Sequence, residues 1–395
     1  MRPSKCLSQL YSLSRKIIHN ISLRAIYTWI LQTLANSFVL VVFLCIARWL
    51  IPTLGANQLY YHSNNPFIQH LNRRLDYSNH DRWNEIRADW ADSILATANF
   101  SRFKVPKSSK PRLVIAITAS ARQNKELTQV MAFLSAHLHT DYPIVICNTE
   151  VAGRRPEPIQ RFENLVHIID INMNMSTWTP GNKEDRWMKE AQDYWRCMSQ
   201  ALETLFNAEH RPDYLLVLED DAVPIPLFDA AIRSVMNQLD FLTDIDYVKF
   251  YRKWSWRGGS AMYQSLMVAL LLSYLLQTFL WNNRNILTIV SVWILIQYVW
   301  QFYFRQLISD ARFQLTHKVM LTAMEGCCTP AVLYRTTRVP ELLDAMWETT
   351  LGAVMPKDVI LDKMTDFAGR ISDFNLVVHI GYYSELNRAY KDPGN

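Results

Sequence analysis

Residues 214–221 read Tyr-Leu-Leu-Val-Leu-Glu-Asp-Asp, an apolar run followed at once by three acids. An uninterrupted apolar run of this length, Tyr214–Leu218, is typical of a strand that is buried on both faces of a sheet. In open α/β sheets, ligands bind at the carboxyl ends of the strands. Because Glu219, Asp220 and Asp221 stand there, this stretch predicts both a central strand and a site.

The chain before residue 214 alternates between strands and helices. Leu113–Ala119 is a continuous apolar, β-branched run, and Pro143–Cys147 and Leu165–Ile169 are further predicted strands. Helical spacing follows over residues 125–138 and again over residues 184–209. This alternation predicts an α/β fold with a mostly parallel sheet flanked by helices.

The pattern resumes towards the C-terminus. The predicted elements are the helices 227–239, 339–349 and 358–368, and the strands 247–250, 332–334 and 376–380. The part after residue 304 has too few elements for a core of its own, because a domain needs two packed layers. We therefore expect one domain built from residues 111–261 and 305–395. Two separate domains are the alternative.

Three stretches are long and apolar enough to span a bilayer, which requires about 20 mostly apolar residues in a helix. They cover residues 26–50, 262–280 and 286–304, and the short link Trp281–Asn285 makes the last two a hairpin over 262–304. Neither hairpin span contains a charge, and Trp and Tyr lie near the ends as interface anchors do. Buried core helices are the alternative.

Basic residues before the first span set the topology. Arg2, Lys5, Arg15, Lys16 and Arg24 favour the cytoplasmic side. We expect a cytoplasmic tail over 1–25, an uncleaved signal anchor over 26–50, and a lumenal stem over 51–110 with a helix near 81–98. Both halves of the domain are then lumenal. The net charge of +5 is mild and Lys and Arg form no stripe, which argues against a nucleic-acid partner.

In this topology four of the six cysteines are lumenal: Cys147, Cys197, Cys327 and Cys328. An oxidising compartment permits two disulfides among them, in three connectivities. Asn99-Phe-Ser and Asn174-Met-Ser are sequons for N-glycosylation on the same side, although such tripeptides also arise by chance.

The three adjacent acids repel one another, so they require a cation or strong donors nearby. A hard divalent ion such as Mn²⁺ prefers oxygen ligands and would also neutralise a diphosphate. In a nucleotide-sugar transferase such a metal stabilises the departing nucleoside diphosphate. An exposed acidic turn before Pro224 is the alternative.

An apolar strand followed by Glu-Asp-Asp resembles the DxD motif of GT-A glycosyltransferases. Further features are the anchor, the late hairpin, Cys327-Cys328-Thr329-Pro330, Lys357-Asp358 and Val378-His379-Ile380-Gly381-Tyr382-Tyr383-Ser384. Together they resemble the post-GPI-attachment N-acetylgalactosaminyltransferase family over nearly the whole chain. This resemblance implies a Golgi membrane enzyme that transfers GalNAc from UDP-GalNAc to the mannose core of GPI anchors on GPI-anchored proteins.

The resemblance also implies roles for single residues. Asp221 would contact Mn²⁺, Glu219 and Asp220 would hold the ribose and metal-bound water, and His379 would complete the metal site or touch the pyrophosphate. The residues that would line the UDP-sugar site after the first strand are Thr118, Ala119, Ser120 and Arg122. Arg122 can bind a phosphate bidentately, although a surface arginine at a helix start is an equal reading.

Asp358 is the candidate base for an inverting displacement, the stereochemistry that the resemblance favours. An aspartate at a helix start is also commonly a cap, which is the plainer reading. For the cysteines we prefer the pair Cys147–Cys197.

Two other functions remain open at this stage. The His-Ile-Gly-x-x-Ser ending is also similar to the branching GlcNAc-transferases of N-glycans, which lack the hairpin. A non-catalytic membrane scaffold is the second alternative; a transporter is disfavoured because the hairpin spans contain no ionisable residue.

Overall fold

The computed structural model describes the chain from residue 80 onward with gaps. The described residues are 80–104, 110–122, 125–175, 177, 181–206, 209–252, 293, 309, 312–313, 315–324, 328–352, 354–381, 383–384 and 389–390. The predicted anchor, the hairpin apart from Trp293, and Cys327 lie outside them. Within these ranges, no helix combines the length and apolar character that a bilayer crossing requires.

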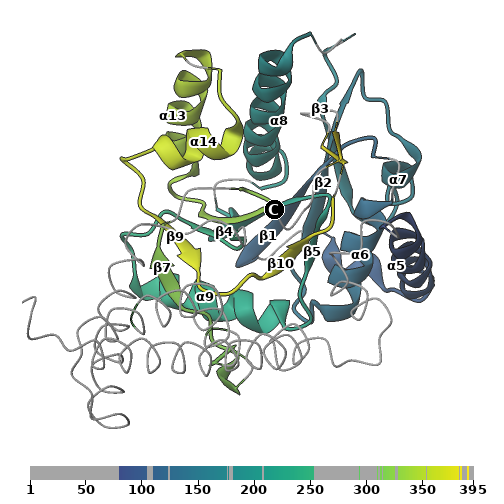
Figure 1. The fold of residues 1–395 in the computed structure, drawn as a ribbon, viewed down its shortest axis with the longest axis horizontal. Coiled ribbons are helices and arrows are strands. Elements are labelled where there is room, and N and C mark those ends of the chain that lie inside the picture. The colour runs from purple at the N-terminus through teal and green to yellow at the C-terminus, as the bar shows by residue number, and fades with distance from the viewer. Residues whose placement is uncertain are drawn as a thin grey trace, which may run out of the picture.

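A mixed sheet of eight strands forms the centre of the molecule (Figure 1), in the order β3-β2-β1-β4-β8-β6-β9-β7. Its strands are β1 (Leu113–Ala119), β2 (Ile144–Val151), β3 (His167–Asn172), β4 (Tyr214–Glu219), β6 (Tyr247–Lys249), β7 (Leu321–Ala323), β8 (Ala331–Arg335) and β9 (Gly369–Ser372). The pairs from β3 to β4 are parallel, whereas β8 runs antiparallel to both its neighbours. The predicted α/β class is confirmed, and the sheet is parallel in one half and mixed in the other.

Strands from both sides of residues 253–314 contribute to this one sheet. β8 lies between β4 and β6 and pairs with both, with Leu216 and Val248 each opposite Leu333. Without β8, β4 and β6 would each lose the hydrogen-bond partners along one edge, which is costly for buried backbone groups. The first part of the chain therefore does not complete the sheet alone; the exact domain boundaries stay a prediction.

Helices cover both faces of the sheet. One face carries α8 (Lys183–Glu203), α13 (Val339–Gly352) and α14 (Lys357–Lys363), and the other carries α6 (Glu126–His137) and α9 (Phe228–Phe241) (Figure 1). The side chains of β1 alternate accordingly: Ile115 and Ile117 join the cluster with α6, while Val114 and Ala116 join the cluster with α8. Burial on both faces explains why this strand is apolar throughout.

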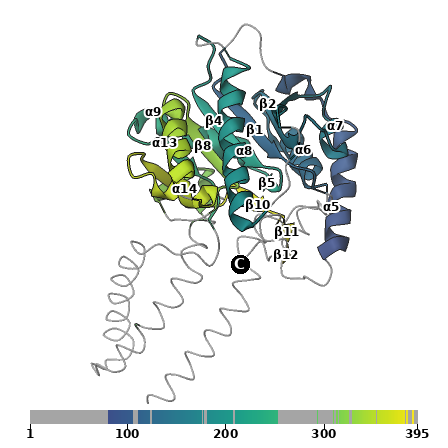
Figure 2. The same cartoon turned by 90° about the horizontal axis from the view of Figure 1, so that it is seen from above.

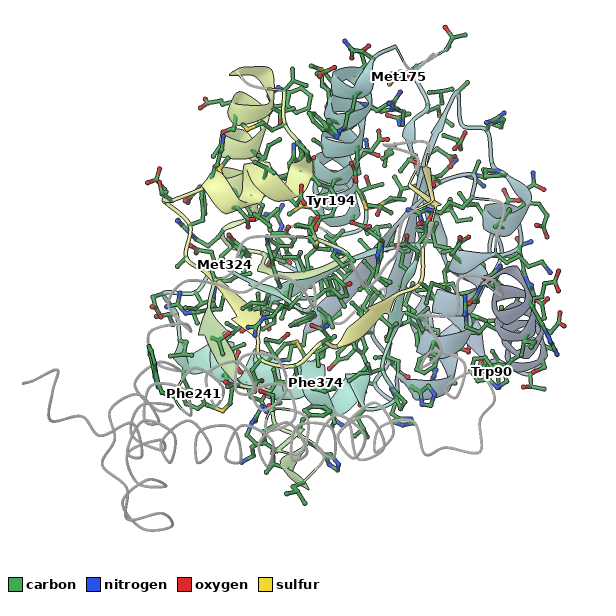
Figure 3. All side chains as sticks on the ribbon, in the orientation of Figure 1. Trp90, Met175, Tyr194, Phe241, Met324 and Phe374 are labelled. Atoms are coloured by element: carbon green, nitrogen blue, oxygen red, sulfur yellow. A yellow bond between two sulfur atoms is a disulfide. The ribbon has the colours of Figure 1, made fainter. Side chains whose placement is uncertain are left out.

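Part of the predicted stem packs against this body. Helix α5 (His80–Leu95) lies along the outer side of α6 (Figure 2), and the Trp90 ring contacts Phe133 at 6.0 Å between centroids (Figure 3). Arg87 Nε donates to Gln129 Oε1 at 2.9 Å in a buried hydrogen bond. Phe103, in the short 3-10 helix Phe100–Phe103, is fully buried.

Several short elements were not expected from the sequence. They are α7 (Glu157–Gln160), β5 (Ala222–Pro224), β7 and β9, and the small strands β11 (Tyr383–Ser384) and β12 (Ala389–Tyr390). The helix predicted over 358–368 ends at Lys363, because Gly369 already begins β9. The helix predicted over 184–209 likewise ends at Glu203.

A disulfide joins the sheet to its helical layer. Cys147 on β2 and Cys197 on α8 are bonded, with their Cα atoms 5.6 Å apart, which confirms the preferred pair. Cys328 is disulfide-bonded as well.

Replacing both Cys147 and Cys197 by Ala should lower the free energy of unfolding by about 4 kcal/mol, since the bridge closes a loop of 50 residues in the unfolded chain. Thermal unfolding of the purified protein measures this loss. Each single variant should be destabilised to a similar extent, because either one removes the bridge. Unchanged melting in all three variants would contradict the bridge.

Candidate metal and sugar-nucleotide site

A strand pair outside the main sheet brings the C-terminal histidine to the acids. β5 begins directly after Asp221 and pairs antiparallel with β10 (Val377–His379), so that His379 lies opposite Ala222. The Ile380 backbone N–H donates to the Asp221 carbonyl at 2.9 Å, which extends the pairing by one residue. Residues far apart in the sequence thereby meet at the carboxyl end of β4.

Glu219, Asp221 and His379 form a compact cluster. His379 Nε2 lies 3.2 Å from Asp221 Oδ2 and 3.9 Å from Glu219 Oε2, and one potential ligand atom of each residue lies within 4.8 Å of the others. The Asp221 side chain is 1% exposed, and its Oδ1 has no hydrogen-bond partner among the described residues. A buried oxygen without a donor is unusual, and two carboxylates with one imidazole suit Mn²⁺ or a similar ion. These residues fit a divalent cation.

Asp220 faces the end of β1. Its Oδ2 accepts from the Ser120 backbone N–H at 3.0 Å, and its Oδ1 lies 2.9 Å from Arg122 Nε. Arg122 also pairs through Nη1 with Asp221 Oδ2. The predicted phosphate-binding arginine is therefore held by two of the three acids.

The electrostatics follow from burial and these pairings. Burial raises the pKa of Asp220 to about 7, and the Arg122 charge offsets only part of this effect. Burial also raises the pKa of Asp221, but Arg122 and His379 outweigh it and leave that pKa well below its usual range. Burial lowers the pKa of His379, and the Asp221 charge outweighs it, so that the pKa is raised. Asp221 is thus an ionised acceptor, the form in which a carboxylate binds a metal.

The other predicted residues divide into two groups. Thr118 and Ala119 lie at the end of β1 next to Ser120, and Thr118 Oγ1 donates to the Leu218 carbonyl at 3.2 Å. Asp358 lies in the first turn of α14, where its Oδ1 accepts from the Val359 N–H at 3.0 Å. In the described part of the chain, no hydrogen bond or ion pair joins Asp358 to the cluster.

Two charged residues at the site escaped the sequence reasoning. Lys357 Nζ lies 2.9 Å from Glu219 Oε1 and also pairs with Glu190 on α8. Lys357 was noted only as part of a motif. The only signal for Glu190 was its position one helical turn before the apolar Tyr194, on the side of α8 that faces the sheet.

Gly381 closes the cluster at very short range. A Cβ atom on this residue would lie 2.0 Å from Asp221 Oδ2 and 2.8 Å from Arg122 Nη1. Real Cβ atoms do not approach so closely, and neither group is free to move because Asp221 and Arg122 hold each other. Only glycine, which has no Cβ, lets the backbone approach the Asp221 carboxylate so closely at this position.

Gly381→Ala should therefore displace the Asp221 carboxylate and weaken Mn²⁺ binding by at least about 10-fold, as expected when a ligand loses its orientation. Titration with Mn²⁺ followed by electron paramagnetic resonance measures this change. Gly352→Ala is the matched control, since a Cβ there meets no atom within 4 Å. Equal Mn²⁺ affinity in the two variants would contradict the assignment.

Two comparisons with known proteins bear on this chain. The solved structure of the mannosyltransferase Ktr4p from S. cerevisiae is a distant likeness, with 10% identity and a TM-score of 0.28 over 73% of this chain and 77% of that chain. The sequence model of the family described as GPI-N-acetylgalactosamine transferase PGAP4 matches residues 113–375, more than half of the chain. That match includes the three acids, Arg122 and Lys357 but ends before His379. The chain belongs to the GPI-N-acetylgalactosamine transferase PGAP4 family and is a glycosyltransferase.

Proposed function

We propose that this protein transfers GalNAc from UDP-GalNAc to the mannose core of GPI anchors, with Mn²⁺ or another divalent cation held by Glu219, Asp221 and His379. The observation that carries the proposal is the unpartnered, buried Oδ1 of Asp221 within a cluster of two carboxylates and an imidazole. The family match supports the sugar and the acceptor. The cation, when bound, supplies positive charge for the departing diphosphate.

The protein's own residues have distinct tasks in this proposal. Ser120 and Arg122 hold Asp220 at the end of β1, where the nucleotide is expected. Arg122 also pairs with Asp221 Oδ2, and Asp221 Oδ1 stays without a hydrogen-bond partner among the described residues. Asp358, next to Lys357 at the start of α14, is our proposed base for the acceptor hydroxyl. Burial raises the pKa of Glu190, and the charges of Glu219 and Asp358 add to this, while the Lys357 charge offsets part of it. The Asp358 carboxylate therefore lies near Glu190.

We place the catalytic domain in the Golgi lumen, with the N-terminus in the cytoplasm. The Cys147–Cys197 bridge supports this placement, because disulfides form and persist in oxidising compartments. Both sequon asparagines, Asn99 and Asn174, are exposed and therefore accessible to glycosylation. The predicted anchor over 26–50 and the predicted hairpin over 262–304, inserted within the domain, would keep the site near lipid-anchored acceptors.

The full-length protein in detergent, assayed with a released GPI glycan, should transfer GalNAc from UDP-GalNAc in the presence of Mn²⁺. EDTA should abolish the transfer and added Mn²⁺ should restore it. Asp221→Asn should lower kcat/KM by at least about 100-fold, because charge stabilisation by a metal is worth several kcal/mol.

Asp244→Asn serves as the control, since Asp244 is an exposed acid far along the chain from the cluster and its loss should leave kcat/KM unchanged. Full activity in EDTA, or in Asp221→Asn, would contradict the metal site. Transfer from a different UDP-sugar, such as UDP-GlcNAc, would replace the donor and keep the reaction class.

The lumenal placement predicts N-glycans on the protein made in cells. Asn99→Gln and Asn174→Gln should each migrate faster in gels than the unchanged protein, and treatment with an N-glycanase should remove the difference. The double variant should no longer respond to the N-glycanase. An unchanged protein that carries no N-glycan at either asparagine would argue for a cytoplasmic domain.

A further inference from the structure

A buried lysine connects two helices to the metal cluster. Lys357 is the first residue of α14, and its side chain is 9% exposed. Its Nζ lies 2.9 Å from Glu219 Oε1 and 2.5 Å from Glu190 Oε1. One ammonium thus bridges a carboxylate at the end of β4 and a carboxylate on α8.

A second residue of α8, Tyr194, also contacts Lys357. Lys357 Nζ lies 5.5 Å from the ring centroid of Tyr194, which follows Glu190 by one turn of α8 (Figure 3). The Tyr194 hydroxyl is hydrogen-bonded to the Tyr334 hydroxyl of β8 at 3.0 Å. Because α8 is fixed to the central sheet in this way, Glu190 gives Lys357 a rigid support.

The charges keep this lysine protonated. A buried ammonium is costly unless it is paired. Burial lowers the pKa of Lys357, but the charges of Glu190 and Glu219 outweigh it and raise that pKa overall.

The contact fixes the orientation of Glu219. The two oxygens of a carboxylate lie in one plane at a fixed angle, so a contact that holds Oε1 against Lys357 also restricts the direction of Oε2. That second oxygen is the one that lies 3.9 Å from His379 Nε2, on the side of the cluster. With Oε1 released, rotation of the side chain would remove Oε2 from this position.

We propose that Lys357 and Glu190 are positioning residues for the metal ligand Glu219: Glu190 holds Lys357, and Lys357 presents Glu219 Oε2 to the cation. The inference rests on the proposed metal-dependent function. Groups that orient a metal ligand through a hydrogen bond typically change metal affinity by 10- to 100-fold when they are removed. A purely electrostatic role of Lys357 predicts the opposite effect: its removal would tighten Mn²⁺ binding, since a lysine beside a ligand repels a cation.

The test is Mn²⁺ binding to full-length Lys357→Met, measured by electron paramagnetic resonance alongside thermal unfolding. Positioning predicts a Kd for Mn²⁺ that rises by about 10- to 100-fold. Lys249→Met is the matched control: Lys249 on β6 is also buried, and its Nζ lies 2.5 Å from Asp362 Oδ1. It should lower the melting temperature and leave the Kd unchanged.

Unchanged or tighter Mn²⁺ binding in Lys357→Met would overturn the inference. Where that variant does not fold, Glu190→Gln carries the test, because it keeps the size of the side chain and should raise the Kd in the same direction. Lack of Mn²⁺ binding in the unchanged protein would instead defeat the proposed function. The two failures are therefore distinguishable.

Discussion

Repulsion among three consecutive carboxylates at the end of β4 constrains the rest of this structure. Each acid is compensated by a different part of the chain. Asp220 is held by the end of β1, Asp221 by Arg122 and by His379 on β10, and Glu219 by Lys357 on α14. Since like charges at such short range are tolerated only with partners nearby, these distant segments must all meet at one point.

The topology satisfies this requirement across a long interruption of the sheet. Lys357 and His379 both follow residues 253–314, whereas the acids and Arg122 precede them. β8 enters between β4 and β6 and carries the later chain back to the centre of the sheet, while β10 pairs with β5 immediately beyond the acids. The pairing of β8 within the sheet and the pairing of β10 with β5 therefore both bring the later part of the chain to the acids.

The sequence predicts those parts of this arrangement that depend on local pattern. The fully apolar β1 and the apolar run before Glu219 identified the central strands, because burial on both faces leaves no polar position. The acids predicted a site at this edge of the sheet, since three carboxylates at the end of a buried strand require compensating charges nearby. The main helices were found from their spacing, with errors at their ends.

Long-range pairings are not encoded in a local pattern. β5 and β9 have only a few residues each, too short for a period to be seen, yet β5 is the strand that places His379. Glu190 and Lys357 look like ordinary surface charges of helices, and only the packing of α14 against α8 reveals them as a pair. The pairing of Arg122 with Asp220 and Asp221 is likewise absent from the local pattern, and its role toward a phosphate stays a prediction.

The charge of the assembled cluster explains why a divalent cation fits. Among the described residues, Glu190, Glu219, Asp220 and Asp221 form ion pairs with two permanently charged side chains, Arg122 and Lys357. Burial is the largest cause of the raised pKa of Asp220, and the Asp221 charge adds to it. For His379 the Asp221 charge outweighs burial and raises the pKa. A divalent cation would add two positive charges beside these four carboxylates, and its binding would displace any protons that its ligands hold. The buried Oδ1 of Asp221 has no hydrogen-bond partner among the described residues and is therefore an oxygen that such a cation would satisfy.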